Sequence, residues 1–267
     1  MEIIGYVLAI MIGLLLSVLG GGGSILTVPV LVYVFGLPPN LATAYSLGIV
    51  GASSLVGSLN YLRKGLASPK TALFFSFPSF LMVYIMRKIV MPLIPNKILI
   101  TNTLSIDKNL VVMVTFALTM LLAASSMIKR KGKNTSDDIN EIRKRLNYPL
   151  IFIEGLAVGT LTGFVGVGGG FLIIPVLTNF VKLPMKFAVG TSLMIIAINS
   201  LMGFWGDAGN QLLDYHFLLT FTTLSILGVF IGSYVSKFVS NQQLKPLFGW
   251  FTLLMGCWIL IKELFLK

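Results

Sequence analysis

Charged residues are scarce in this sequence. Only 11% of its 267 residues are Asp, Glu, Lys or Arg, whereas 56% are hydrophobic. A soluble domain carries about 25% charged residues, and a chain this apolar cannot cover its surface with groups that water solvates. The composition therefore excludes an ordinary soluble domain. It predicts an all-α integral membrane protein that crosses the cell membrane several times.

Cysteine and histidine are almost absent. Cys257 is the only cysteine, so no internal disulfide can form, and His216 is the only histidine. The sequence has no HExxH pattern, which disfavours a histidine-based metal site, and no GxxxxGK[ST] phosphate loop for ATP. No pattern points to a serine-based or carboxylate-based catalytic site. We therefore predict a protein that is not an enzyme and carries no cofactor or metal.

Positive charge is in excess, with a formal net charge of +11. The basic residues lie between apolar runs, as at Arg63 and Lys64, which is typical of cytoplasmic loops in membrane proteins. We therefore expect membrane lipid around the protein and no nucleic-acid partner. Arg87 and Lys88 fit this pattern poorly because they lie near the outer end of an apolar segment. We expect their side chains to extend to the interface or to face the protein interior.

Long apolar segments divide the chain into two membrane parts. A hydropathy plot gives about eight segments, at residues 3–19, 41–62, 71–94, 109–128, 149–165, 187–205, 215–238 and 245–265. Residues 24–35 and 170–181 are also apolar, but each would be only about 18 Å long as a helix, so we predict half-helices. The predicted division is a first membrane repeat at 1–128, a basic cytoplasmic linker at 129–148 and a second membrane repeat at 149–267.

The two parts resemble each other. When the sequence is shifted by 146 residues, so that Gly20 falls on Gly166, GGGGSILTVPVL aligns with GVGGGFLIIPVL without a gap. The match continues with Leu-Pro pairs and Ser-Leu pairs in the same register. Chance would not place glycine clusters, prolines and serines together in this way. We therefore predict an internal duplication.

The orientation of the two repeats follows from the glycine clusters and the basic residues. If each cluster turns the chain back, each half has three full spans and one re-entrant hairpin. Because three is odd, the two halves are inverted relative to each other. This arrangement places more lysines and arginines in the cytoplasm than the parallel alternative, in which residues 3–19 and 149–165 cross fully. We therefore predict six full spans plus two re-entrant hairpins.

The glycine clusters are the strongest candidates for a binding site. Each is followed by a half-helix, whose free N–H groups and positive dipole end would point into the protein. Two such ends from inverted repeats suit an anion near the membrane midplane. The alternative is that the glycines only allow close helix packing. The candidate substrate-binding residues here are Gly22, Gly23, Ser24, Gly168, Gly169 and Gly170.

The duplicated glycine motif, with its trailing proline, Leu-Pro pair and Ser-Leu run, resembles the signature of the sulfite exporter TauE/SafE family. The resemblance covers nearly the whole chain. The two copies differ, since Gly21–Ser24 reads GGGS and residues 167–170 read VGGG. The family is similar in consisting of multi-span permeases for sulfite, sulfonates and other small organosulfur anions.

This resemblance implies a secondary transporter that exports a small sulfur-containing anion. We expect alternating access coupled to an ion gradient. The alternatives are an anion channel, since re-entrant half-helices also build selectivity filters, and a transporter of an unrelated small anion. Assembly into a homo-oligomer is left open.

Polar side chains in the following segments are further candidates. Ser46 and Ser53 recur at seven-residue spacing, and the repeat places Ser192 and Asn199 at the equivalent positions. Their hydroxyl and amide groups could bind sulfonate oxygens without a buried permanent charge. The alternative is hydrogen bonding between helices.

Acidic residues offer one candidate for proton coupling. Glu154 is the carboxylate that lies clearly within an apolar segment, where acids are often functional. The alternative is that it faces interfacial water near the start of its segment. We expect Asp207 and Asp214 to lie in an outer loop in contact with solvent.

Overall fold

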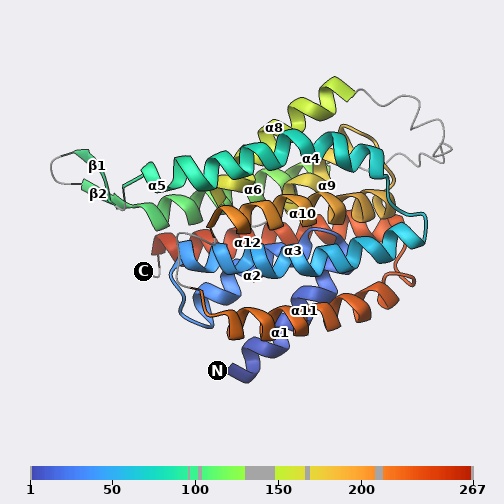
Figure 1. Cartoon of the computed structure of the whole chain (residues 1–267), viewed down its shortest axis with the longest axis horizontal. Coiled ribbons are helices and arrows are strands. Elements are labelled where there is room, and N and C mark those ends of the chain that lie inside the picture. The colour runs from blue at the N-terminus through green and yellow to red at the C-terminus, as the bar shows by residue number, and fades with distance from the viewer. Residues whose placement is uncertain are drawn as a thin grey trace.

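The computed structural model describes residues 2–95, 97–101, 104–129, 148–165, 169–207 and 213–265, and these form a bundle of helices (Figure 1). The elements in chain order are α1 (Glu2–Leu19), α2 (Gly22–Tyr33), α3 (Pro39–Arg63), α4 (Pro69–Ile85), the π-helical turn η1 (Met86–Val90), α5 (Met91–Leu93), β1 (Lys97–Thr101), β2 (Leu104–Asp107), α6 (Lys108–Lys129), α8 (Tyr148–Val165), α9 (Gly170–Asn179), α10 (Met185–Asp207), α11 (Tyr215–Val235) and α12 (Asn241–Phe265).

Six helices of the described part are long and apolar enough to cross a membrane. They span Pro39–Arg63, Pro69–Leu93, Lys108–Ile128, Met185–Asp207, Tyr215–Val235 and Gln243–Glu263. Four shorter apolar helices accompany them, Ile4–Leu19, Gly22–Tyr33, Pro149–Val165 and Gly170–Asn179. The predicted all-α membrane fold with six full spans and two glycine-broken pairs of shorter helices is therefore confirmed. Residues 130–147 of the predicted linker lie outside the described residues.

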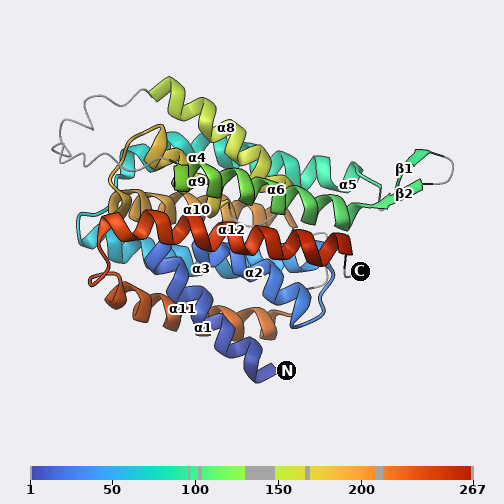
Figure 2. The ribbon, with the colours of Figure 1, turned by 180° about the vertical axis from the view of Figure 1, so that it is seen from behind.

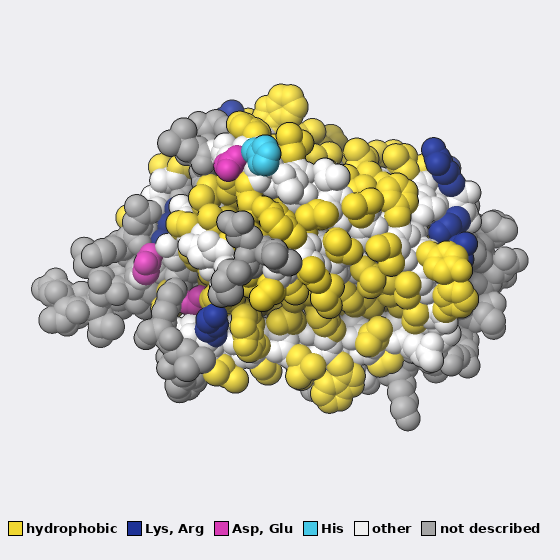
Figure 3. Space-filling view, turned by 90° about the horizontal axis from the view of Figure 1, so that it is seen from below, with side chains coloured by type: hydrophobic (Ala, Val, Ile, Leu, Met, Phe, Trp, Pro, Cys, Tyr) yellow, Lys and Arg dark blue, Asp and Glu magenta, His cyan; other side chains and the backbone are white. Residues whose placement is uncertain are grey.

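The surface of the bundle is apolar between its ends. Figure 3 shows hydrophobic side chains over the middle of one face, with lysine and arginine gathered toward the ends. Large side chains on this surface are strongly exposed, including Trp205 at 80% and Leu219 at 65%. Hydrocarbon solvates such a belt well, whereas water does not. The chain is therefore a multi-pass membrane protein.

Proline, glycine and capping residues set the ends of several helices. α3 and α4 each begin with a proline in the first turn, where its missing N–H costs nothing. α3 is followed by Gly65, which has a φ of +68°. Asp214 accepts hydrogen bonds from the backbone N–H groups of His216 and Phe217, so it caps the start of α11 from the loop. A two-stranded hairpin, β1 paired antiparallel with β2, was not predicted and lies beyond α5 at one end of the bundle (Figure 1).

The helices pack in matching pairs from the two halves. α1 lies along α11, and the equivalent helix of the second half, α8, lies along α4. α3 and α10 also occupy equivalent positions in the repeat, and they pack side by side in the centre. They run antiparallel, because Gly51 lies against Leu201 whereas Gly57 lies against Leu193. This packing supports the predicted inversion of the halves, which stays a prediction together with the division at residues 128 and 149.

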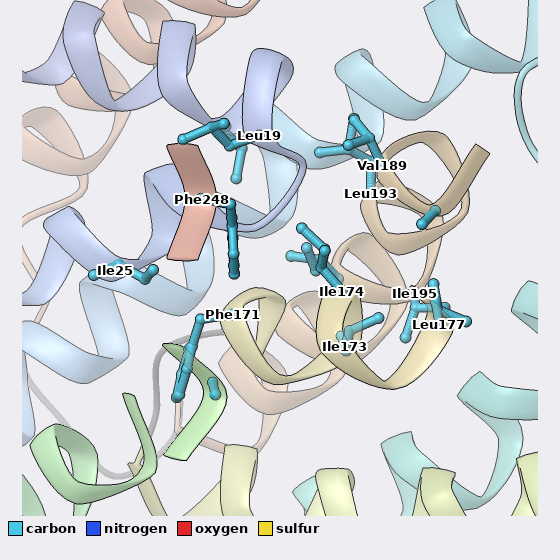
Figure 4. Packing of buried hydrophobic residues seen from close by; sticks show 14 of the residues in the cluster. Leu19, Ile25, Phe171, Ile173, Ile174, Leu177, Val189, Leu193, Ile195 and Phe248 are labelled. Carbon is cyan, nitrogen blue, oxygen red and sulfur yellow. The ribbon is translucent and has the colours of Figure 1, made fainter. Parts of the chain in front are cut away.

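Each short helix pair lies within this frame. α1 and α2 form an antiparallel hairpin, since Gly5 contacts the ring of Phe35 and Gly23 contacts Leu16. α6 and α12 pack against each other, and they also contact α9 and α2, respectively (Figure 2). The core surrounds the two half-helices, and Figure 4 shows Ile25 of α2 and Phe171 of α9 among its buried side chains. The two half-helices are therefore held in the middle of the molecule.

Candidate functional site

The two glycine breaks touch each other. A Cβ atom placed on Gly21 would lie 2.1 Å from the carbonyl carbon and oxygen of Gly170, and one placed on Gly170 would lie 2.6 Å from the Cα of Gly21. These distances leave room only for hydrogen at both positions. The starts of α2 and α9, which come from different halves, therefore meet backbone to backbone.

Among the described residues, no side chain caps either half-helix. The residue before α2 is Gly21 and the residue before α9 is Gly169, and no described side chain accepts a hydrogen bond from the first N–H groups of either helix. Gly169 has a left-handed φ of +68°, which glycine adopts without strain. The first N–H groups of a helix have no partner within the helix and carry its partial positive charge. Two such positive ends therefore meet at the contact between Gly21 and Gly170.

Two of the predicted serines lie against this contact. The Oγ of Ser24 would be 3.1 Å from a Cβ on Gly170, and the Oγ of Ser192 would be 2.8 Å from a Cβ on Gly20. Both hydroxyls already donate to backbone carbonyls, Ser24 to Gly21 at 2.6 Å and Ser192 to Val189 at 2.8 Å. In this structure they can therefore offer an incoming ligand only their lone pairs. Gly22 and Gly23 open α2 and are buried, whereas Gly168 lies outside the described residues.

Six buried hydroxyls have no hydrogen-bond partner among the described residues, those of Ser17, Ser46, Ser54, Ser76, Thr162 and Ser200. Of these, Ser46 of α3 is a predicted site residue, and Thr162 lies near the end of α8. The Oγ1 of Thr162 lies beside the second break, only 2.0 Å from where a Cβ of Gly169 would be. The repeat did not point to Thr162, because its equivalent in the first half is Leu16. Its position shortly before the GVGGG cluster was the available signal.

Ser53 and Asn199 make equivalent hydrogen bonds between helices. The Ser53 hydroxyl donates to Ser225 Oγ at 3.0 Å, and the Asn199 Nδ2 donates to Ser79 Oγ at 2.7 Å. Ser79 and Ser225 also correspond in the repeat. These two contacts support the alternative reading of both residues, in which they join neighbouring helices. The Asn199 Oδ1 is buried without a partner among the described residues.

We expect Ser225→Ala and Ser79→Ala to destabilise the fold modestly. Each replacement removes one buried hydrogen bond, which contributes about 0.6 kcal/mol and at most about 2 kcal/mol within membranes. Unfolding in mixed micelles should therefore shift slightly. A double-mutant cycle with Ser53→Ala and Ser225→Ala measures the coupling directly. Strict additivity of the two single changes would contradict the bond.

Glu154 lies away from the glycine breaks. It is half-buried on α8, and both carboxylate oxygens are buried without a partner among the described residues. Its neighbour Gly155 packs against the backbone of Phe75 in α4. Val165, at the end of α8, is about 16 Å further along the helix. The structure therefore does not bring Glu154 to the predicted anion site.

The expectation for Asp207 was wrong. Asp207 is the last residue of α10 and is only 5% exposed, so it does not lie in a solvated loop. Its Oδ2 pairs with the Nη1 of Arg87 at 3.0 Å, and Arg87 is 3% exposed. The misfit of Arg87 to the charge pattern was the signal for a buried acidic partner. The pair joins the two halves at one end of the bundle.

Polar contacts also join the halves at the opposite end. The Nδ2 of Asn60 donates to the Oγ of Ser233, and the Nζ of Lys64 lies 3.5 Å from the same oxygen. Burial, together with the charge of Lys237, lowers the pKa of Lys64. Two lysines therefore concentrate positive charge where α3 and α11 end, which would attract an anion to this end.

A cavity of about 360 Å³ lies at the far end of α2 rather than at the breaks. Its lining includes Tyr33, Pro38 and Glu263. The Tyr33 hydroxyl donates to Glu263 Oε1 at 3.0 Å, and the Nζ of Lys262 lies 3.7 Å from the centre of the Tyr33 ring. This cluster closes α12 against the hairpin of α1 and α2.

Comparisons with known proteins agree with this architecture. The chain is 25% identical over 254 residues to a probable membrane transporter protein of Xylella fastidiosa strain 9a5c, covering 94% of this chain and 91% of that one. It is 38% identical over 109 residues to a probable membrane transporter protein of Methanocaldococcus jannaschii, covering 39% and 41% of the two chains. The comparison with solved structures found no match. The sequence model of the sulfite exporter TauE/SafE family matches residues 6–259, and the chain therefore belongs to this family of membrane transporters.

Proposed function

We propose that this transporter exports a small sulfur-containing anion, most simply sulfite or an organosulfonate, and binds it where α2 and α9 begin. The observation that carries the proposal is the backbone contact between Gly21 and Gly170. Two positive helix ends that meet in an apolar core repel each other. An anion bound beside them offsets this repulsion and accepts hydrogen bonds from their free N–H groups.

Two buried hydroxyls suit an oxyanion. Ser46 and Thr162 are donors without a partner among the described residues. Thr162 lies beside the second break, and Ser46 is the repeat equivalent of Ser192, which lies beside the first. Each can donate to a sulfonate or sulfite oxygen, whereas Ser24 and Ser192 could do so only after giving up their bonds to backbone carbonyls. No permanent positive charge is needed at this point. A site without a permanent positive charge binds an anion less tightly, which suits a transporter that must also release its substrate.

The arrangement of the two halves supports a mechanism of alternating access. The contacts of Arg87 with Asp207 and of Asn60 with Ser233 close opposite ends of the bundle. Opening one pair while the other holds exposes the central site to one side at a time. An ion gradient, most simply of protons, drives the cycle. Glu154 is the candidate proton carrier. Because it lies away from the glycine breaks, its protonation would act on helix packing rather than on the anion.

Transport assays in proteoliposomes test the proposal. Radiolabelled sulfite and a panel of sulfonates are offered with and without an imposed pH gradient. Saturable, gradient-dependent flux supports the transporter. Flux that neither saturates nor responds to the gradient indicates the anion channel, and saturable flux of other anions alone moves the substrate to an unrelated class.

We expect the double variant Ser46→Ala and Thr162→Val to bind the anion poorly. A hydrogen bond to a charged group contributes about 1.5–3 kcal/mol, so loss of both should raise KM by at least about tenfold. The measurement is the concentration dependence of initial sulfite flux. Thr223→Val is the matched control, because its hydroxyl is exposed and bonds only to its own helix. An unchanged KM in the double variant would remove these hydroxyls from the site.

A further inference from the structure

Arg87 is held in the interior by an incomplete set of partners. Its Nη1 donates to Asp207 Oδ2 at 3.0 Å and to Thr43 Oγ1 at 3.1 Å. Its Nε and Nη2 are also buried, and neither has a hydrogen-bond partner among the described residues. A static buried pair between arginine and a carboxylate usually uses two parallel bonds. Here the carboxylate meets a single nitrogen, and the whole Nε–Nη2 edge is unused.

The unused edge has the geometry of an oxyanion receptor. The N–H groups on Nε and Nη2 point in parallel and match two oxygens of a carboxylate, phosphate or sulfonate. Asp207 neutralises the charge of Arg87 without occupying this edge. Lys108 places a second cation at the same end of the bundle, where its Nζ donates to the carbonyls of Met91 and Ile94. A negatively charged ligand would therefore be well compensated here.

The backbone around Arg87 departs from a regular α-helix. Arg87 lies in η1, a π-helical turn that joins α4 to α5, and such turns are frequent at functional sites. Its two partners come from separate helices, Thr43 from the start of α3 and Asp207 from the end of α10. Separation of these helix ends would uncover the unused edge.

Only the first half of the repeat carries a buried arginine at this position. The positions equivalent to Arg87, Asp207 and Thr43 are Ser233, Tyr61 and Val189. An arginine buried at one end alone is not needed for the symmetric packing of the helices. It gives this end a chemistry that the other end lacks, where Lys64 is exposed.

We propose that Arg87 is an oxyanion-binding residue of the transport path. When this end of the bundle opens, the Nε–Nη2 edge binds the substrate anion, and when the anion leaves, the pair with Asp207 and Thr43 closes the end again. The identity of the anion rests on the proposed function, whereas the receptor edge does not. Asp207 thus competes with the anion for the charge of Arg87.

Nuclear magnetic resonance of protein labelled with ¹⁵Nε-arginine tests the proposal in micelles. The Arg87 signal is identified by its loss in Arg87→Lys. Sulfite and methanesulfonate should shift this signal saturably, and at lower concentration than chloride, whose single atom cannot give each of the two parallel N–H groups its own acceptor. The titration is made on the wild-type chain, and only the assignment of the signal uses the variant.

Binding and flux measurements on variants complete the test. Arg87→Lys keeps the charge but loses the two parallel N–H groups of the guanidinium, and we expect it to raise the Kd for the anion at least tenfold. Asp207→Asn removes the competitor, and we expect a lower Kd with slower turnover. Arg63→Lys, an exposed change at the opposite end, is the matched control and should behave as the wild type.

The outcomes separate this proposal from the proposed function. In one outcome the protein transports sulfite normally, but the Arg87 signal does not move and the Kd of Arg87→Lys equals that of Arg63→Lys. This outcome rejects Arg87 as an anion-binding residue and leaves the proposed transport function standing. A signal that shifts with phosphate but not with sulfur oxyanions, in a protein that does not transport sulfite, supports the receptor and rejects the substrate. A lack of response to any oxyanion rejects the receptor.

Discussion

Replacement of Gly21 by alanine is expected to abolish transport. The new methyl group would lie 2.1 Å from the carbonyl of Gly170, and a backbone atom cannot turn away as the end of a side chain can. The starts of α2 and α9 must therefore move apart. Because these two starts form the proposed anion site, a shift of about 1 Å is enough to reduce the rate by about 100-fold. Initial sulfite flux at equal protein density measures the effect.

The control for this change is Gly57→Ala. Gly57 is also a buried glycine, in α3, but its nearest neighbour would be the Cδ1 of Leu193 at 3.3 Å, a side-chain methyl that can adjust. We expect this variant to keep most of its activity. Size-exclusion chromatography shows whether each variant remains a single species. Wild-type flux in Gly21→Ala would mean that the contact of the two breaks is not part of the transport path.

Replacement of Gly159 by alanine is expected to destabilise the fold strongly. Gly155, Gly159 and Gly163 form a stripe on α8 at a spacing of four residues, and the stripe lies against α4. A methyl group on Gly159 would lie 2.4 Å from the carbonyl oxygen of Ser79. The two helices approach closely because these residues are small, and this packing holds them together in lipid. Overpacking here should cost about 1–3 kcal/mol.

Unfolding in mixed detergent micelles measures this cost. Gly206→Ala is the comparison, because its Cβ would meet nothing closer than 3.5 Å, and we expect its stability to change by less than about 0.5 kcal/mol. The double variant Gly155→Ala and Gly159→Ala should lose more than either single variant. If the free energy of unfolding of Gly159→Ala equalled that of Gly206→Ala, close packing of α8 on α4 would not be a source of stability.

Membrane spans were predictable from the sequence because the bilayer imposes a simple requirement. A run of about 20 apolar residues must be helical, since lipid offers no partner for backbone N–H and C=O groups. The half-helices followed from the same rule, because their apolar runs are too short to cross. The repeat then indicated which glycines correspond. The hairpin of β1 and β2 has no such rule behind it and was missed.

Side-chain partners in the site were harder to predict, because they depend on which helix faces which. Ser53 and Asn199 could have met a ligand or another helix, and only the packing of α3 with α11 and of α10 with α4 distinguishes the two. Asp207 was misplaced because the apolar run seemed to end at Trp205. A buried acid at a helix end can be recognised only when its partner, here Arg87, is known.

The crossed packing of the outer helices has a consequence for biogenesis. α1 is made well before α11, the helix against which it packs, because most of the described helices lie between them in the chain. The backbone contacts of Gly13 with Ser225 therefore form only after α11 has been made. Until then the insertion machinery or lipid must shield α1. A nascent chain that stops after the first half therefore lacks α11 and α8, the helices that pack on its α1 and α4.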